Sequence, residues 1–326
     1  MTRRAFLTQA ASLAAATSLP ALSGAAFAQA TSRIVVGFAA GGPGDVLARV
    51  VAEQLKRPLG NTVIVDNRPG AAGRIAINAV RSAEPDGLTM LNSPSSVLTL
   101  LPHAVPAGDF NPLQDLVPVG TLSELDFALV INGKLPARNL AEYLQLVRTN
   151  ERQGSYGSPG AGTPQHMVGL MMGKAADVRM THVAYKGGGP ALQDVMGGAI
   201  PACIGTISEP MIAAHKDGRI RILATTGTKR SSFLTDVPTL AEAGLRGVSA
   251  TDWTSLLVPA RTPAPVIARL SRALLEVAGS AEFKTAINRF YLEPLALDAK
   301  ASLERMQAEY AAWRPVVKAS GFTLDT

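Results

Sequence analysis

The sequence predicts an α/β fold built on a mostly parallel sheet with helices on both faces. Short apolar stretches with strand character alternate along the chain with stretches whose apolar residues recur at helical spacing, a pattern typical of parallel sheets with crossover helices. Glycine-rich turns repeatedly join a strand to the next helix. The chain has 326 residues, which is enough for two domains or one large one.

Residues 1–30 have the character of an export signal. Arg3 and Arg4 precede a stretch rich in Ala, Leu and Ser without acidic residues, which ends in the small-x-small site Ala28-Gln29-Ala30. The arginine pair with Phe6 and Leu7 resembles a twin-arginine signal, and an ordinary secretory signal is the alternative. We therefore expect a mature protein that is soluble in the periplasm.

Composition narrows the classes of partner. Cys203 is the single cysteine, so no intramolecular disulfide is expected and the fold must rely on its apolar core. The formal charge of +6 comes from 31 basic and 25 acidic residues without a basic cluster interleaved with aromatic residues. This mild excess suits a small anionic ligand and argues against a nucleic-acid partner.

The first glycine-rich turn, residues 38–45, follows an expected strand at 34–36 and precedes an expected helix at 46–55. Its small side chains would let a ligand approach the backbone, and we expect Asp45 to accept hydrogen bonds from the first helical turn. A helix N-terminus also favours anions. Leu47 replaces the third glycine of a dinucleotide fingerprint, and no P-loop Lys follows. The turn is either an anion-binding loop or a tight packing turn.

The next elements are a strand at 62–65, a helix at 75–80 and a strand at 88–91. The polar residues 92–96 follow directly. Ligands of open α/β sheets bind beyond the carboxyl ends of strands, so Ser93 and Ser95 are candidates for the site, against the alternative of a solvated loop.

Residues 103–120 show little periodicity, and we place the first crossing between domains there, before a strand at 127–131. A helix at 141–148 then leads to a second glycine-rich turn, in which Thr163 suits an N-cap and Pro164 the first helical position. Ser158 has Gly160 after it but Tyr156 where a nucleophile elbow needs glycine. A catalytic triad stays open as an alternative without support from spacing, and the four histidines have no metal-binding pattern.

The remaining elements continue the alternation. We expect a helix at 191–196 after a third glycine-rich turn, strands at 201–204, 220–225 and 248–259, and amphipathic helices at about 266–275 and 303–317. These last two helices are expected to pack on the first domain.

Several motifs occur in a specific order along the mature chain. They are Phe38-x-x-Gly41-Gly42-x-x-Asp45, Asn67-Arg68-Pro69-Gly70, Tyr156-Gly157-Ser158-x-Gly160-x-Gly162-Thr163-x-x-His166, Asp236-Val237-Pro238-Thr239-Leu240, and Trp313-x-x-Val316-Val317. In this order the chain resembles the extracytoplasmic solute receptors of tripartite tricarboxylate transporters, the Bug-type receptors.

The resemblance implies a two-lobed periplasmic binding protein of type II, a Venus-flytrap in which each lobe is a sheet flanked by helices. Lobe 1 would hold residues 31–130 and 253–326, and lobe 2 residues 131–252. The two glycine-rich turns would act as pincers on one ligand carboxylate. The expected ligand-binding residues are Phe38, Ala39, Ala40, Gly41, Gly42, Asp45, Ser93, Ser158, Gly160, Gly162, Thr163 and Gly205.

The implied function is to bind a small carboxylate and deliver it to the permease subunits of a tripartite tricarboxylate transporter. We expect a monomer without catalytic residues, metal or cofactor. Gly44 and Gly205 replace polar residues common in the family, which predicts a ligand that is bulkier or less polar away from its carboxylate, such as an aromatic acid. The alternatives are an exported hydrolase-like enzyme using Ser158 and a receptor that signals to a sensor without transport.

Overall fold

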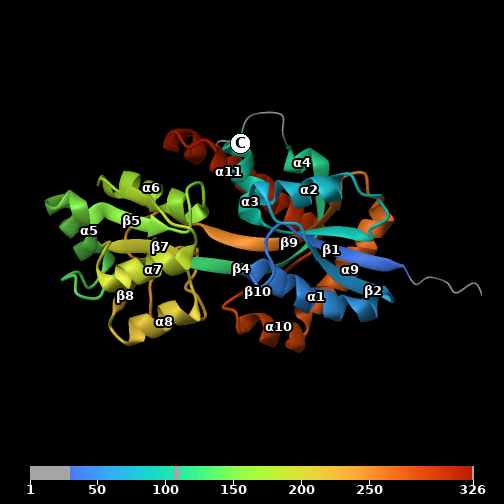
Figure 1. Cartoon of the computed structure of the whole chain (residues 1–326), viewed down its shortest axis with the longest axis horizontal. Helices are drawn as coiled ribbons and strands as arrows, with labels where there is room; N and C mark the ends of the chain where they lie inside the picture. The colour runs from blue at the N-terminus through green and yellow to red at the C-terminus, as the bar shows by residue number, and fades with distance from the viewer. Residues whose placement is uncertain (1–29, 106–109, 325–326) are drawn as a thin grey trace, which may run out of the picture. The chain divides into compact units, whose positions relative to one another are not determined.

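The computed structural model describes residues 30–105 and 110–324, so the export signal expected at residues 1–30 lies almost wholly outside the described residues. The strand β4 (Leu116–Asn132) organises the fold. Residues 116–126 pair antiparallel with β9 (Thr251–Pro259), and residues 127–132 pair with strands from the following part of the chain. Figure 1 shows β4 and β9 in the middle of the view.

The described strands form one ten-stranded sheet in the order β2-β1-β3-β9-β4-β7-β5-β6, with β8 and β10 also paired to β4. The strands that precede β4 in this order form, with β10, the first half-sheet. The strands that follow β4 in this order form, with β8, the second half-sheet. The first contains β1 (Thr31–Val36), β2 (Thr62–Asn67), β3 (Thr89–Pro94), β9 and β10 (Glu293–Leu297). The second contains β5 (Ser155–Ser158), β6 (Thr181–Ala184), β7 (Ala202–Thr206) and β8 (Ile220–Thr225). Strands β1, β2 and β3 run parallel, as do β5, β6 and β7.

Both faces of the sheet are buried, as the sequence predicts. Ile34 and Val36 of β1 pack in one cluster with α1 (Pro43–Leu59) and α9 (Ala264–Gly279), whereas Val35 packs in another with α2 (Arg74–Arg81). Leu129 and Val130 of β4 likewise pack in two different clusters, one on each face of the sheet. This alternation follows from the two-residue period of a strand. The α/β fold is therefore confirmed.

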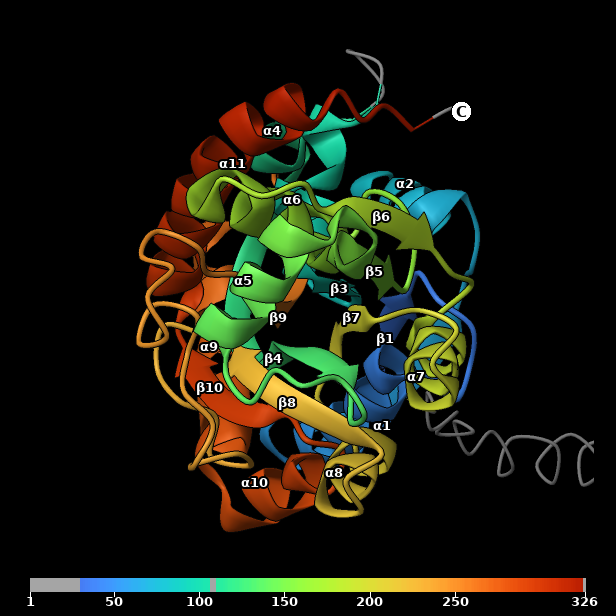
Figure 2. The same cartoon turned by 90° about the vertical axis from the view of Figure 1, so that its left-hand side faces the viewer.

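Other helices complete the two halves. Those beside the first half-sheet are α3 (Ser95–Thr99), α4 (Pro112–Asp115) and α10 (Ala281–Asn288). Those beside the second are α5 (Leu140–Thr149), α6 (Pro164–Ala176), α7 (Gly188–Gly197) and α8 (Glu209–Lys216). Figure 2 views the second half-sheet from the front.

The helix α11 (Ala299–Ser320) contributes to the core of both halves. Met306 packs beside Trp253 in the first half-sheet, whereas Trp313 and Val317 pack with residues of α6. The backbone N–H of Leu324 then returns to the first half, where it donates a 2.6 Å hydrogen bond to the carbonyl of Ala104. The helix thus packs on the first half, as expected, and it packs on the second half as well. Residues 31–326 form one compact unit. The lobe boundaries stay a prediction.

Two local expectations also differ from the structure. The strand expected at 127–131 already begins at Leu116, because Pro118 and Gly120 lie at a register shift that hides its alternation. Residues 92–96 are not a loop, since β3 continues to Pro94 and α3 begins at Ser95. The short elements α8, α10 and β10 were not predicted.

Candidate functional site

The first glycine-rich loop, residues 38–45, joins β1 to α1, which begins at Pro43 with Gly42 as an N-cap that makes no side-chain hydrogen bond. Asp45 lies inside the helix, so its carboxylate reaches backwards and accepts from the N–H of Gly41 and Nε of Arg49, both at 2.9 Å. The expectation that Asp45 caps the first helical turn was therefore wrong. The Arg49 hydrogen bond is the main reason that the Asp45 pKa falls to about 2, against the opposing effect of burial.

Two asparagines hold the carbonyl groups of this loop. Asn67, at the end of β2, donates to the carbonyl of Phe38 at 3.1 Å, and Asn92, on β3, donates to the carbonyl of Gly44 at 3.0 Å. Both strands lie beside β1. The aromatic ring of Phe38 remains 40% exposed. The neighbouring strands thus fix the loop from its carbonyl side.

Several N–H groups of this loop remain available. The first hydrogen bond of α1 runs from the N–H of Val46 to the carbonyl of Gly42. Within the described chain, the N–H groups of Ala39, Ala40, Gly44 and Asp45 donate to no protein atom. Unpaired N–H groups at the start of a helix attract a carboxylate. The loop therefore has the chemistry of an anion site.

The second glycine-rich loop, residues 158–163, joins β5 to α6. The hydroxyls of Ser158 and Thr163 both donate to the carbonyl of Gly160, at 2.9 and 2.8 Å. Thr163 also accepts from the N–H of His166, which confirms the predicted N-cap. The N–H of Gly162 donates to Nδ1 of His166 at 3.1 Å. Among the described residues, the N–H of Ala161 has no partner.

Ser158 and His182 form a close pair in this loop, with 2.7 Å between Oγ and Nε2. Such a pair is a requirement for a serine nucleophile. Ser158 is fully buried, however, and its hydroxyl also contacts both the carbonyl and the N–H of Gly160. No carboxylate of the described chain contacts His182 to orient it. The pair holds the loop together.

The structure groups the predicted site residues into two sets. Phe38 to Asp45 form the first loop, and Ser158 to Thr163 form the second. Ser93 lies buried within β3, where it pairs with Ser255 and donates to the carbonyl of Pro94 at 3.1 Å. Gly205 lies buried in β7, where an added Cβ would be 3.1 Å from Cε of Met211.

The two loops belong to different half-sheets, and no hydrogen bond joins them in the described chain. Figure 1 shows the start of α1 opposite α7, the helix that follows the third glycine-rich turn in the second half-sheet.

Sequence reasoning missed the side chains that support the loops. These are Arg49, Asn67, Asn92, His182 and Phe322. Asn67 begins one of the ordered motifs, so the motifs contained a signal for it. The contact between Phe322 and Gly162 joins segments far apart in sequence and left no local signal.

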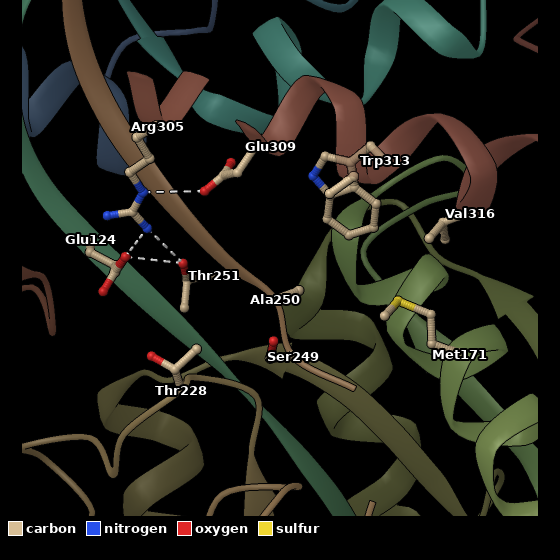
Figure 3. Close-up of a pocket in the computed structure, with 11 residues that line it drawn as sticks. Glu124, Met171, Thr228, Ser249, Ala250, Thr251, Arg305, Glu309, Trp313 and Val316 are labelled. Atoms are coloured by element: carbon tan, nitrogen blue, oxygen red, sulfur yellow. Dashed lines mark hydrogen bonds and ion pairs between the residues drawn. The ribbon is translucent and has the colours of Figure 1, made fainter. Parts of the chain in front are cut away.

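A crevice of about 260 Å³ lies apart from both loops, between α11 and the strands β4 and β9, which connect the two half-sheets. Figure 3 shows Arg305 of α11 bonded to Glu124, Thr251 and Glu309, with Trp313 and Met171 on the opposite side. Trp253 also donates to Glu309, at 2.6 Å. The network fastens α11 to β4 and β9.

Within residues 30–105 and 110–324, no group of three or more His, Cys, Asp or Glu side chains could hold a metal ion. No helix in this part of the chain combines the length and apolar character needed to cross a membrane.

Comparison with known proteins identifies the family. Protein BugT of Bordetella pertussis is 30% identical over 294 residues, which cover 90% of each chain. The structure of MatC from Rhodopseudomonas palustris with bound malate is 27% identical, with a TM-score of 0.73 over 88% of this chain and 98% of that one. An R. palustris protein solved with adipate is 28% identical, with a TM-score of 0.76 over 90% of this chain and 98% of that one.

The model of the protein family described as "Tripartite tricarboxylate transporter family receptor" matches residues 47–322 of this chain. This match covers most of the chain and confirms the resemblance drawn from the ordered motifs. Proteins of this family are solute receptors. The protein therefore belongs to the tripartite tricarboxylate transporter receptor family.

Proposed function

We propose that the protein is a periplasmic receptor that binds a small carboxylate between the loops 38–45 and 158–163 and delivers it to the permease of a tripartite tricarboxylate transporter. The observation that carries this proposal is the set of free N–H groups in the first loop, at Ala39, Ala40, Gly44 and Asp45. Backbone donors at a helix start suit a carboxylate. Relatives solved with malate and adipate support the ligand class.

Lobe closure would bring the second loop to the same carboxylate. The free N–H of Ala161 supports this role, because it lies beside the Gly160 carbonyl that Ser158 and Thr163 hold in place. Hinge closure on a ligand is common among two-lobed receptors. In this proposal residues 31–130 with 253–326 and residues 131–252 are the two lobes, residues 1–30 are the export signal, and the receptor works as a monomer without metal or cofactor.

The distal end of the ligand is proposed to be bulky or weakly polar. At Gly44 an added Cβ would be 3.7 Å from its nearest neighbour, Nδ2 of Asn92, so the position has room that no hydroxyl fills. At Gly205 the apolar methyl group of Met211 occupies the nearest space. Both positions favour a ligand body that is bulkier or less polar than that of a short dicarboxylate.

A thermal-shift screen of the mature protein tests this proposal. The panel contains succinate, malate, adipate, citrate and benzoate at millimolar concentration, because a ligand of the folded state raises the melting temperature by mass action. A Gly42→Trp variant would block the first loop, and Gly279→Trp, where nothing lies within 4 Å of an added Cβ, is the matched control. We expect a shift with adipate or benzoate that only Gly42→Trp abolishes. A response to succinate and malate alone would contradict the bulky-ligand proposal.

An exported hydrolase is the second candidate, because Ser158 Oγ lies 2.7 Å from Nε2 of His182. Hydrolysis of short-chain p-nitrophenyl esters by the protein, lost in Ser158→Ala, would favour it over a receptor. We expect no turnover above that of Ser158→Ala, because the hydroxyl is buried and engaged with Gly160. A receptor that signals without transport would instead be distinguished by capture of a sensor kinase in place of a permease.

A further inference from the structure

Gly162 is held from two sides within the second loop. It adopts a left-handed φ of +76°, and its N–H donates to Nδ1 of His166 at 3.1 Å. The ring of Phe322 covers its Cα, since an added Cβ would be only 2.3 Å from Cε1 of that ring. The next N–H before Gly162 is the free donor of Ala161. The position of that donor therefore depends on His166.

A second imidazole supports the first. The rings of His166 and His182 stack with 3.8 Å between centroids and 21° between planes. His182 contacts Ser158 at the start of the loop, and His166 contacts Gly162 near its end. Tyr156 donates from its hydroxyl to the carbonyl of His166 at 2.8 Å. The stack thus holds both ends of a loop whose middle offers the free N–H.

This arrangement requires a neutral ring at His166. Nδ1 can accept a hydrogen bond from the Gly162 N–H only when the single proton of the neutral ring is on Nε2. A protonated ring would also carry a proton on Nδ1, and this N–H would face the N–H of Gly162. Burial lowers the pKa of His166, and burial together with its neighbour lowers that of His182 to about 4. The other groups in contact are the titratable Tyr156 on β5 and the apolar Phe322 after α11, and no charged side chain of the described residues bonds to either imidazole.

We propose that His166 is a positioning residue for ligand binding, which holds Gly162 and the adjacent donor in place when neutral and releases the loop when protonated. This inference rests on the proposed carboxylate-binding function. It predicts that ligand affinity falls in acid for a reason that lies in the protein. The carboxylate ligand also titrates in acid, so a variant must separate the two effects.

His166→Asn provides this separation. The side-chain oxygen of Asn can take the place of Nδ1 as an acceptor, and it does not titrate. His166→Leu removes the acceptor. Calorimetric titration with the best-binding acid of the panel is compared at pH 7.5 and 4.5, with far-UV circular dichroism to establish that each protein is folded. Any protonation of the ligand affects wild type and His166→Asn equally.

We expect wild type and His166→Asn to bind within about twofold of each other at pH 7.5, and the variant to bind about tenfold tighter at pH 4.5, the scale of one lost hydrogen bond. His166→Leu should bind about tenfold more weakly than wild type at pH 7.5. A ratio between wild type and His166→Asn that is the same at both pH values would overturn the inference while leaving the receptor function intact.

A readout without ligand keeps the two proposals distinguishable. The protection factor of the Gly162 amide, which is the ratio of its intrinsic to its observed exchange rate measured by NMR, should fall more between pH 7.5 and 4.5 for wild type than for His166→Asn. If no acid of the panel binds at either pH, the proposed function fails and amide exchange decides the inference. Equal exchange profiles for the two proteins would overturn it.

Discussion

Nε1 of Trp253 donates a 2.6 Å hydrogen bond to Oε1 of Glu309, which links the crossing strand β9 to the helix α11. The same carboxylate oxygen accepts from Nε of Arg305 at 3.2 Å, and Arg305 also bonds to Glu124 of β4. The guanidinium lies 5.5 Å from the centroid of the Trp253 ring. One helix face therefore fastens both strands that connect the half-sheets.

Replacement of Glu309 should loosen this fastening. We expect Glu309→Ala to lower the free energy of unfolding by about 3 kcal/mol, because it leaves the Trp253 N–H and part of the Arg305 charge without a partner. Urea unfolding followed by tryptophan fluorescence measures the change. Glu304→Gln is the control, because Glu304 stands on the same helix with a side chain that is 66% exposed. A loss no greater than that of the control would contradict this role.

Gly162 should not tolerate a side chain. Gly162→Ala would place a methyl group against Phe322 at a left-handed φ, and we expect a loss of about 2 kcal/mol in unfolding free energy. Phe322→Ala in the same chain should recover the part of the loss that comes from the clash. Gly189→Ala is the control, since nothing lies within 4 Å of an added Cβ there. Additive effects of the two substitutions in a double-mutant cycle would show that the residues are not in contact.

Asp45 should stabilise the protein in a pH-dependent way. Its pKa in the folded protein, about 2, lies below the usual 3.8. The stabilising effect of its charge is therefore complete above about pH 4 and disappears as the pH falls towards 2. Asp45→Asn should be less stable than wild type at pH 7, with a difference that narrows between pH 4 and 3 in urea titrations. Asp217→Asn, on an exposed ion pair, is the control for loss of a carboxylate charge.

Asp126 should affect the pH dependence of stability in the opposite direction from Asp45. It lies where β4 passes from one half-sheet to the other, and burial, followed by the charges of Glu124 and Glu293, raises its pKa to about 7 against the effect of Lys229. The folded state thus holds a proton that the unfolded state releases near pH 4, so stability falls as the pH rises from 4 to 7.

Asp126→Asn removes this buried charge. We expect it to raise the free energy of unfolding by on the order of 2 kcal/mol at pH 8 and to change it little at pH 4. Urea unfolding at the two pH values measures the effect, and an equal change at both would show that the carboxyl group does not titrate as stated.

The sequence predicted those parts of the fold that depend on local patterns. The strand expected at 220–225 matches β8, and the N-cap at Thr163 forms as expected. The start of β4 was missed, because Pro118 and Gly120 interrupt its apolar alternation and the pairing with β9 compensates for them. Strand length there depends on a partner more than 130 residues away, which no local pattern contains.

The candidate site was likewise predicted only in the parts that depend on local patterns. Small residues in a strand-to-helix turn indicated both loops. The hydrogen bond of Asp45 was assigned to the wrong N–H, because the start of α1 at Pro43, two residues earlier than Asp45, depends on Gly42 as N-cap. His182 and Phe322 act on the second loop from β6 and from the end of the chain. Such support is tertiary, so spacing alone could not indicate it.

The helix α11 couples the folding of the two halves. Met306 fills the core beside Trp253, and Trp313 and Val317 fill the core beside α6, so one helix completes both halves. Neither core can close before this helix docks. A protein that lacks the turns of α11 around Trp313 and Val317 would therefore expose apolar surface in the second half even where Met306 still packs in the first.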